Sequence, residues 1–411
     1  MKPTNLIFLS NVIISFSFFS CNQSAEKSEN GNNKDIEKQL QEKLINARKG
    51  DVIEIPEGTF NFTRSLSMDA VPFVTIRGAS QTKTILSFKG QTEGAEGIKV
   101  TNSNDFTIEN LSIQDTKGDG IKIQDCKNVV VRKLTVAWTG GAKAENGSYG
   151  IYPVTCKNVL IEKCEAIAAS DAGIYVGQSE NIIVRNNAAH ENVAGIEIEN
   201  CAFADVYDNK SYNNSGGIFI FDLPELPKKN GHHIRVFNNL VQNNNHPNFA
   251  PAGNIVALVP AGTGTFVMST REVDVFKNEI SGHITTSVAV VSFLLTQKPY
   301  KDSLYNPFSS GVFIHDNKII QPPAMADTTR PLGKLTAMLF KGNTPQIIYD
   351  GFLDPAFVEK SGKTSEAGKL CIRNNGEIKF ANINAPSNFK NIKTDLKEHD
   401  CERGELSGVE L

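Results

Sequence analysis

A recurring motif, Gly-Ile-x-apolar, places several chemically active side chains in equivalent positions. Strand side chains alternate between two faces, so the x position faces away from the Ile that precedes it. Along the chain the x positions hold Lys99, Lys122, Tyr152, Tyr175, Glu197 and Phe219. Lysines can pair with uronate carboxylates, tyrosines can stack on sugar rings, and carboxylates can bond hydroxyl groups. The motif therefore predicts a sheet face suited to an acidic polysaccharide.

Neighbouring positions add further polar groups to this face. Glu199 lies two residues beyond Glu197, Asp171 and His190 precede motifs, and Asp222 follows one. Chemistry on uronans needs a cation near the substrate carboxylate, a base for the C5 proton and an acid for the leaving oxygen. We therefore predict that the catalytic residues are Lys122, Tyr175, Glu197 and His190. The predicted substrate-binding residues are Lys99, Tyr152, Asp171, Glu199, Phe219 and Asp222.

Other readings of these residues stay open. A solenoid must have a solvated face, where charged and tyrosine side chains are ordinary. No cofactor is required, but a calcium ion could take the place of the lysines, with oxygen ligands from Asp171, Glu197, Glu199 and Asp222. The segment Asp222 to Pro227 is interpreted as a rigid covering loop. His232 and His233 follow it, and adjacent strand residues point to opposite faces, so we predict no metal site there.

A repeat of about 22 residues must position these side chains. The motif glycines Gly97, Gly120, Gly150, Gly173, Gly195 and Gly217 are spaced by 23, 30, 23, 22 and 22 residues. Such a unit, with two or three short strands, cannot bury its apolar face alone, so successive units must stack. The sequence predicts an all-β fold, a single-stranded right-handed parallel β-helix. Its hand follows from general crossover chirality and from the resemblance described below.

Stacked coils place equivalent residues in ladders about 4.8 Å apart. The predicted apolar ladder is Ile98, Ile121, Ile151, Ile174, Ile196 and Ile218. A predicted amide ladder is Asn187, Asn209, Asn239, Asn278 and Asn317. Small side chains at a tight corner form the third, Ser103, Cys126, Cys156, Ser179 and Cys201. Cys126 and Cys156 could form a disulfide or pack as reduced thiols, and the sequence leaves both open.

The two ends of the repeat region need closing elements. Residues 34–48 predict an amphipathic helix, with Ile36, Leu40, Leu44 and Ile45 on one face, that caps the first coil. We expect the β-helix to occupy residues 37–325 and a partly irregular segment to occupy residues 326–411. Cys371 to Asn375 echoes the repeat, so this segment can add a late coil. Cys371 and Cys401 are the predicted disulfide that closes it.

The N-terminus has the pattern of an export signal. Residues 1–20 contain Lys2 and an apolar stretch from Leu6 to Phe19, too short to span a bilayer comfortably. Cys21 follows, as in a bacterial lipoprotein signal, and is the predicted lipidation site. An ordinary signal peptide with an incidental cysteine is the alternative. Residues 21–36 are polar and predict a flexible tether. No acidic residue directly follows Cys21. By resemblance to lipoprotein sorting rules, this favours an exported, outer-membrane lipoprotein that contacts the membrane through its N-terminal lipid.

The repeat also supports a resemblance to known proteins. The chain resembles a family of exported bacterial parallel β-helix repeat proteins, many of which look like lipoproteins. The resemblance rests on Tyr149 to Val154, Ser170 to Ser179, Asn192 to Asn200, Phe221 to Pro224 and Asn248 to Pro251. It implies fold and location more than chemistry. The architecture is more distantly similar to pectate and alginate lyases, uronan C5-epimerases and carbohydrate-binding β-helices.

The overall charge of the chain limits which classes of partner are expected. The formal net charge is −3 with 21% charged residues, which gives no general case for nucleic-acid binding. The sequence predicts a cell-envelope protein that binds or processes a polysaccharide, by lyase- or epimerase-like chemistry if it is an enzyme. The alternatives are a non-catalytic surface scaffold that holds an envelope protein or glycan, and a helper in metalloprotein assembly.

Overall fold

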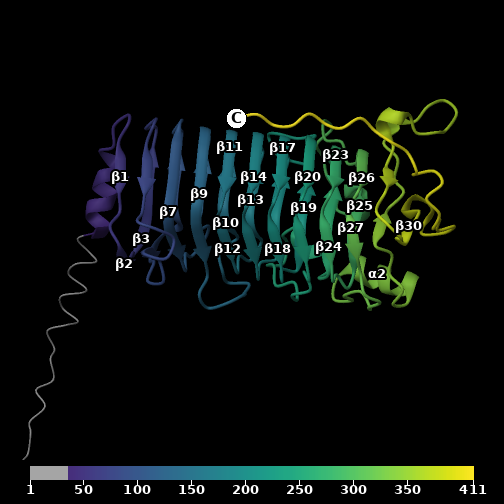
Figure 1. Cartoon of the computed structure of the whole chain (residues 1–411), viewed down its shortest axis with the longest axis horizontal. Helices are drawn as coiled ribbons and strands as arrows, with labels where there is room; N and C mark the ends of the chain where they lie inside the picture. Colours follow the sequence, from purple (N-terminus) through teal and green to yellow (C-terminus); the bar gives the residue numbers. More distant parts are fainter. Residues whose placement is uncertain (1–35) are drawn as a thin grey trace, which may run out of the picture.

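The computed structural model describes residues 36–411, and these residues form one long solenoid. Strands of successive coils stand side by side along its long axis, from β1 at the purple end to β30 at the yellow end (Figure 1). All strand pairs within the solenoid are parallel, and a coil such as β13–β14–β15 contributes one strand to an 11-stranded sheet and two to a 19-stranded sheet. The predicted all-β right-handed parallel β-helix is confirmed. Signal peptide, Cys21 and most of the tether lie outside the described residues.

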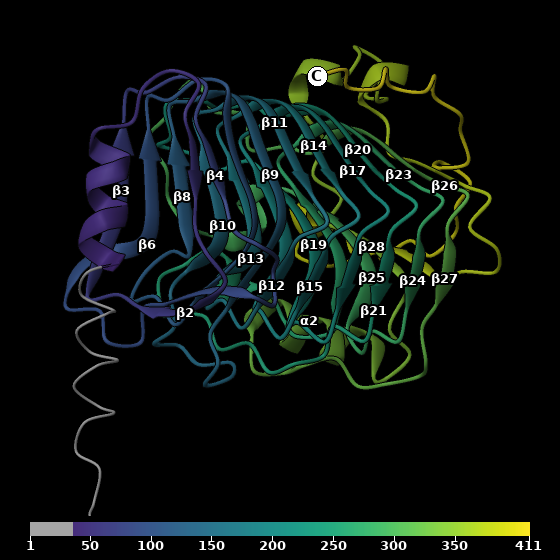
Figure 2. The same ribbon diagram turned by 60° about the vertical axis from the view of Figure 1, so that its left-hand side comes forward.

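We call the 11-stranded sheet sheet I and the 19-stranded sheet sheet II; Figure 2 shows the molecule turned so that its N-terminal end comes forward. Sheet I consists of β3 (Arg64–Asp69), β6 (Glu93–Thr101), β8 (Ile121–Gln124), β10 (Tyr149–Val154), β13 (Ala172–Gly177), β16 (Ala194–Glu199), β19 (Gly216–Phe221), β22 (Thr263–Met268), β25 (Thr286–Val291), β28 (Ile347–Tyr349) and β30 (Phe380–Asn382).

Sheet II has two rows, joined because β7 and β9 run through both. The first row is β1 (Val52–Glu54), β4 (Thr75–Arg77), β7 (Phe106–Gln114), β9 (Lys127–Ala137), β11 (Lys157–Glu162), β14 (Glu180–Arg185), β17 (Ala202–Tyr207), β20 (His232–Phe237), β23 (Arg271–Phe276), β26 (Ser310–His315) and β29 (Cys371–Arg373). The second adds β2 (Gly58–Asn61), β5 (Thr84–Ser87), β12 (Glu165–Ile167), β15 (Ala188–His190), β18 (Lys210–Tyr212), β21 (Leu240–Gln242), β24 (Glu279–Ser281) and β27 (Lys318–Ile320).

The predicted ladders stack in register inside the solenoid. The six isoleucines are at most 1% exposed. Each predicted asparagine accepts from the backbone N–H and side chain of the one before it, as in Asn187 Nδ2 to Asn209 Oδ1 at 2.9 Å, and Asn375 extends the row. A second amide row, Asn192, Asn214 and Asn244, ends at His283. These rows satisfy buried backbone groups at the corners where strand pairing stops.

The small residues of the third ladder are buried at a corner of the solenoid and form hydrogen bonds with neighbouring coils. Cys126, Cys156, Cys164 and Cys201 are buried free thiols. Ser103 N–H donates to Cys126 Sγ, and Cys156 N–H donates to Ser179 Oγ at 3.0 Å. The structure therefore favours reduced packing over a Cys126–Cys156 disulfide.

Both ends of the solenoid are covered. A helix at residues 36–45 packs Leu40 and Leu44 on the first coil, but Ile45 is 68% exposed, so its predicted place on the buried face was wrong. Ile45 is the last helical residue and projects about 100° away from Leu44, outside the direction shared by Leu40 and Leu44. At the far end, β28, β29 and β30 continue the sheets beyond residue 325, and a Cys371–Cys401 disulfide ties the C-terminal segment to β29.

Long insertions cover part of the outer face of sheet I. Residues 222–231, 243–262 and 292–309 leave the coil path, with short 3₁₀ turns η1 (Val256–Leu258) and η2 (Phe293–Thr296), and α2 (Pro331–Phe340) lies next to them. Their apolar residues pack on Phe219, Phe221 and Phe266 as a second hydrophobic cluster outside the solenoid core. Shorter 3₁₀ turns are η3 (Pro355–Phe357), η4 (Glu366–Gly368) and η5 (Ala385–Ser387).

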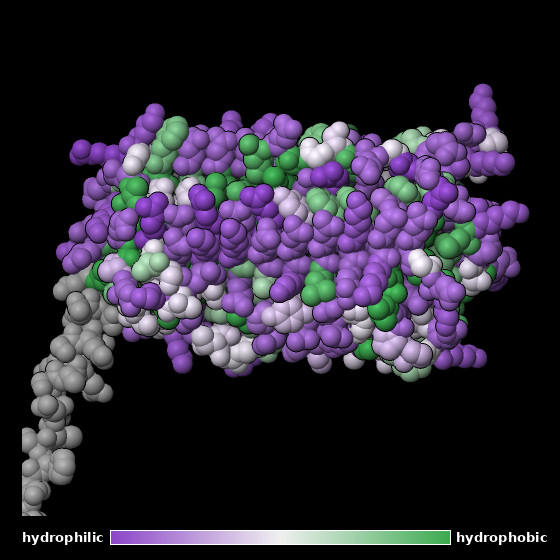
Figure 3. All heavy atoms as spheres, viewed as in Figure 1, coloured by the Kyte–Doolittle hydropathy of each residue, from purple (hydrophilic) through white to green (hydrophobic). Residues whose placement is uncertain are grey.

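One face of the molecule is mainly polar (Figure 3). The face in Figure 3 is covered largely by hydrophilic residues, with small hydrophobic patches between them. Within residues 36–411, no helix is both long and apolar enough to cross a membrane.

Candidate functional site

The x positions of the repeat form one column on the outer face of sheet I. Lys99 pairs with Lys122, Lys122 with Tyr152, Tyr175 with Glu197, and Glu197 with Phe219. Their order follows from strand alternation, because each flanking isoleucine points into the core. The predicted shared face is therefore present.

The sequence predicted that this face is exposed to solvent along its length. In the structure, only part of the face is exposed. Tyr175 is 3% exposed, and Glu197 and Phe219 are each 1% exposed. The insertions at residues 222–231, 243–262 and 292–309 fold back over the C-terminal half of the sheet. Tyr152 packs at the edge of this cover, and Lys99 and Lys122 lie beyond it; all three are half-buried. The expectation of an open face was wrong because the repeat pattern does not show where its insertions fold.

A pocket lies at the edge of the covering loops. Its volume is about 320 Å³. The floor carries three carboxyl groups, those of Asp171, Glu197 and Glu199. The remaining lining residues are Ser148, Tyr149, Leu223, Pro224, Leu226, Asn254 and Ile255. The pocket thus combines acidic groups from sheet I with mainly apolar groups from two loops.

Glu197 and Glu199 face the same side because they are two residues apart on β16. Both side chains line the pocket, and Glu197 Oε2 is buried with no hydrogen-bond partner among the described residues. Burial, followed by the charges of Asp171 and Glu199, holds the pKa of Glu197 well above its usual range. Burial also raises the pKa of Glu199, although the hydrogen bond from Tyr175 acts in the opposite direction. The shift of Glu197 favours its protonated form, whereas the hydrogen bond from Tyr175 favours the ionised form of Glu199.

Asp171 approaches the pair from the turn before β13. Burial first, and then the charge of Glu199, raises the pKa of Asp171 to about 8, although Asn254 Nδ2 donates to its Oδ2 at 2.7 Å. Asn254 belongs to the covering insertion at residues 243–262. The loop is therefore bonded directly to the acidic floor of the pocket.

Three tyrosines form a cluster beside the carboxyl groups. The ring centroid of Tyr149 lies 4.2 Å from that of Tyr175 and 4.7 Å from that of Tyr152. Tyr175 donates its hydroxyl to Glu199 Oε1 at 2.7 Å. It reaches Glu199 by bending over Gly177, where an added Cβ would lie 2.5 Å from the tyrosine hydroxyl. Gly177 is thus needed for the contact between Tyr175 and Glu199.

The lysines belong to the uncovered end of the same face. Lys122 Nζ lies 5.0 Å from the Tyr152 ring centroid. Lys122 and Glu197 are three strands apart, about 14 Å at the usual spacing. Lys122 and Glu197 are therefore too far apart to act on the same atom of a substrate, so the predicted catalytic group is not brought together at one point.

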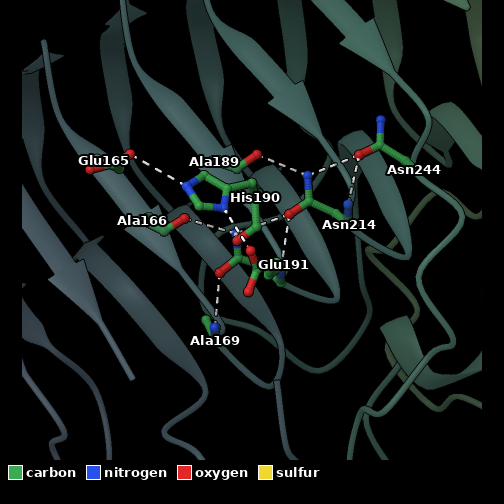
Figure 4. A network of polar contacts seen from close by, with 9 residues as sticks. Glu165, Ala166, Ala169, Ala189, His190, Glu191, Asn214 and Asn244 are labelled. Carbon is green, nitrogen blue, oxygen red and sulfur yellow. Dashed lines mark hydrogen bonds and ion pairs between the residues drawn. The ribbon is translucent and has the colours of Figure 1, made fainter. Parts of the chain in front are cut away.

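His190 lies in a different part of the coil. It is on β15 of sheet II, where Nε2 is 3.3 Å from Glu165 Oε1, Nδ1 is 3.4 Å from Glu191 Oε1, and the ring stacks on Tyr212 (Figure 4). Figure 4 also shows Asn214 and Asn244 of the second amide row nearby. None of these side chains lines the pocket, so the structure does not group His190 with Tyr175 and Glu197.

Asp222 is buried at the start of the first covering loop. Its Oδ2 accepts from Asn230 N–H at 2.6 Å, and burial raises its pKa to about 7. It closes the loop and does not line the pocket. A calcium ion bound by Asp171, Glu197, Glu199 and Asp222 stays a prediction, but no three of these side chains bring oxygens within 4.8 Å of one another. We therefore derive no step through calcium.

The structure changes the reading of His232 and His233. His233 has a φ of +57°, which breaks the alternation of the strand. The two Nδ1 atoms are 2.9 Å apart, so the rings lie on the same side and the expectation of opposite faces was wrong. The residue type of His233 does not indicate that its backbone is left-handed, so this geometry could not be predicted from the sequence.

Several residues of the pocket were missed in the sequence. Tyr149 precedes a motif glycine by one residue, and it could have been found as a ladder neighbour of Ala172. Asn254, Ile255 and Leu223 come from insertions outside the repeat, where periodicity gives no register. Only the floor of the pocket was therefore open to prediction.

Comparison with known proteins gives information about the fold of this chain. Residues 96–293 match the family model described as a right-handed β-helix region. A search of curated proteins gives no significant match.

Among solved structures, the A-module of mannuronan C-5 epimerase AlgE4 of Azotobacter vinelandii is 13% identical, with 82% of this chain and 90% of that chain covered and a TM-score of 0.48. An exopolygalacturonase of Thermotoga maritima is 14% identical, with 68% and 73% covered and a TM-score of 0.44. Alginate lyase AlyF-OU02 is 10% identical, with 77% and 76% covered and a TM-score of 0.44. Because these TM-scores lie below 0.5, the assignment of the fold rests on the parallel ladders and the family model. Together they show that this chain is a right-handed parallel β-helix protein.

Proposed function

We propose that the protein binds an acidic polysaccharide along the outer face of sheet I and processes it, as a lyase or C5-epimerase, at the Glu197–Glu199 pair. The observation that carries the proposal is this pair of buried carboxyl groups, which lines a pocket together with Asp171 and contacts Tyr175 through Glu199. A protonated carboxyl group and an ionised one in the same low-dielectric site can act as acid and base.

The roles follow from the direction of each contact. Glu199 accepts a hydrogen bond from Tyr175, which favours its ionised form, so it is the base for the C5 proton of a uronate. Glu197 is the acid for the 4-oxygen in a lyase reaction. In an epimerase reaction a proton returns to the opposite face of C5 instead. Protonated Asp171 can donate to the substrate carboxylate and stabilise the developing enolate charge.

The uncovered end of the face supplies the binding residues. Lys99 and Lys122 would pair with carboxylates of sugar units outside the pocket, and Tyr152 would stack on a ring next to Lys122. Phe219 and Asp222 are enclosed by the loops and support the pocket rather than contacting the chain.

The test is an assay of the purified protein on a panel of uronans. Absorbance of an unsaturated product reports a lyase, and the uronate composition of the recovered polymer reports an epimerase. Glu197→Gln should reduce the rate at least about 100-fold, because it keeps the size of the side chain but removes the acid. Glu279→Gln, at a half-exposed ion pair with Lys318 on sheet II, is the matched control and should keep the rate. Absence of both products across the panel contradicts the enzyme proposal.

A non-catalytic glycan-binding module is the second candidate, favoured by the tyrosine cluster. In that case an acidic glycan binds without turnover, and Tyr152→Ala weakens binding about tenfold by removing a stacking ring while Glu197→Gln leaves it unchanged. Binding that survives Tyr152→Ala unchanged contradicts the placement of the glycan on this face.

We further propose that Cys21 carries the lipid that holds the protein at the outer membrane, where the polysaccharide or an envelope protein is its partner. The support is the sequence pattern around Cys21. Cys21→Ser should move the protein from the membrane fraction to the soluble fraction, and retention in the membrane fraction contradicts the anchor.

A further inference from the structure

We propose that His232, His233 and Glu272 form a site for a divalent transition-metal ion such as Zn²⁺ or Cu²⁺ on the outer surface of sheet II. Among the described residues, this is the group in which three metal-ligating side-chain atoms lie within 4.8 Å of one another. It is separate from the acidic pocket and does not depend on the proposed polysaccharide chemistry.

The site exists because of a repeated backbone feature. At one corner of successive coils the chain adopts a left-handed residue, with φ between +53° and +57° at Asn158, Asn181, Phe203, His233 and Glu272. Strand pairing skips this position, as between Ala202↔His232 and Ala204↔Ile234. His233 and Glu272 therefore stand one above the other in neighbouring coils, and the left-handed turn brings His233 beside His232.

The contacts between the three side chains leave an excess of lone pairs. His233 Nδ1 lies 2.9 Å from His232 Nδ1 and 2.8 Å from Glu272 Oε2. If His233 Nδ1 carries a proton, that proton can be given fully to only one of its two neighbours. If it carries none, its lone pair faces a carboxylate oxygen. A cation bound among the three atoms would use a lone pair from each of them and remove the mismatch.

The separations also suit a metal ion. In the square-planar geometry typical of Cu²⁺, neighbouring ligands with bonds of about 2.05 Å lie about 2.9 Å apart. In a tetrahedral Zn²⁺ site they lie about 3.3 Å apart, so Zn²⁺ would require a small opening of the group. Two imidazole nitrogens and a carboxylate oxygen are common ligands for Zn²⁺ and Cu²⁺, and all three residues are half-buried. The fourth position stays open to water or to a further ligand.

The surroundings affect the site in two opposing ways. The Phe203 ring packs against both imidazoles, with centroids 5.2 Å and 5.0 Å away, and shields one side of the site from water. Arg271 and Lys228 are positive neighbours that oppose a cation, and the charge of Glu272 offsets part of that effect.

The test is a titration of the full chain, without an affinity tag, with Zn²⁺ and with Cu²⁺. We expect one ion per chain and, for Cu²⁺, an electron paramagnetic resonance spectrum with coupling to two nitrogens. His233→Asn should raise the dissociation constant at least tenfold and leave coupling to one nitrogen. This variant keeps the fold, because Asn occupies the same left-handed position at Asn128, Asn158 and Asn181.

Two further variants separate this site from the others. Glu272→Gln should weaken binding and keep coupling to both nitrogens, which a variant that failed to fold would not do. His246→Ala removes a half-buried histidine elsewhere and should leave the titration unchanged. Failure to bind either ion at one equivalent, or equal affinity in the wild type and His233→Asn, overturns the proposal.

Discussion

At the scale of single residues, buried carboxyl groups define the candidate site. Asp171, Glu197, Glu199 and Asp222 are each at most 7% exposed, and burial raises the pKa of all four. Desolvation disfavours the charged form, so these side chains hold protons at pH values where exposed carboxyl groups have lost them. These groups can therefore take part in acid–base chemistry near neutral pH. The same pKa shifts lower the stability of the folded protein at alkaline pH.

These shifts predict how stability depends on pH. Between the ordinary pKa of 3.8 and the value of about 8 for Asp171, the folded protein binds more protons than the unfolded chain. The free energy of unfolding therefore falls as pH rises through this range. We expect a higher thermal midpoint at pH 5 than at pH 9, measured by circular dichroism.

Asp171→Asn tests the contribution of one group. Asparagine has no charge to desolvate, so the fall in midpoint between pH 5 and pH 9 should be smaller than in the wild type. An unchanged pH dependence would show that the Asp171 carboxyl is already ionised in the folded protein.

The sequence allowed part of this site to be predicted. Glu197 and Glu199 share a face because strand alternation places residues i and i+2 together. Their burial could not be predicted, because the covering residues Leu223 and Asn254 come from insertions with no repeat register. The prediction that His232 and His233 point to opposite faces was wrong for another reason, because their geometry depends on the φ angle of His233.

At the scale of elements, the amide ladders join one coil to the next. Asn239 accepts from the Asn209 backbone N–H at 3.0 Å and donates to Asn278 Oδ1 and to Val206 O, each at 2.9 Å. The spacing of Asn residues was sufficient to predict this ladder. The second row, Asn192, Asn214 and Asn244, was not predicted from the sequence.

We expect Asn239→Ala to lower the free energy of unfolding by about 3 kcal/mol, because it leaves several buried polar groups without partners. Chemical denaturation measures the change. Asn61→Ala, at an exposed strand position, is the control and should shift stability by less than about 0.5 kcal/mol. A similar small shift for both variants would mean that water replaces the lost amide.

At the scale of the whole molecule, the C-terminal tail links distant coils. It runs back across the strands of sheet II towards the middle of the solenoid, as the yellow trace in Figure 1 shows. Leu406 N–H donates to Asp274 Oδ2 and Val409 N–H to Asp205 Oδ2, each at 3.1 Å. Arg235 holds Asp205 through two hydrogen bonds, of 2.8 Å and 2.7 Å, and also donates to Leu406 O. The tail therefore contacts β17, β20 and β23 from outside the core.

The Cys371–Cys401 disulfide is the covalent start of this tail, and its loss should release the tail before the solenoid unfolds. The bond closes a 30-residue separation, for which the chain-entropy relation gives about 3.5 kcal/mol. Few apolar residues of the tail are buried, so the remaining hydrogen bonds compete directly with water. In Cys401→Ser, hydrogen exchange at the Leu406 and Val409 amides should speed up at least tenfold. Exchange in the amide-ladder coils should stay slow, because their contacts do not involve the tail. Reducing agent should reproduce the effect in the wild type and add nothing in Cys401→Ser. Equal protection of both amides with and without the bond would show that the hydrogen bonds to Asp205 and Asp274 hold the tail alone.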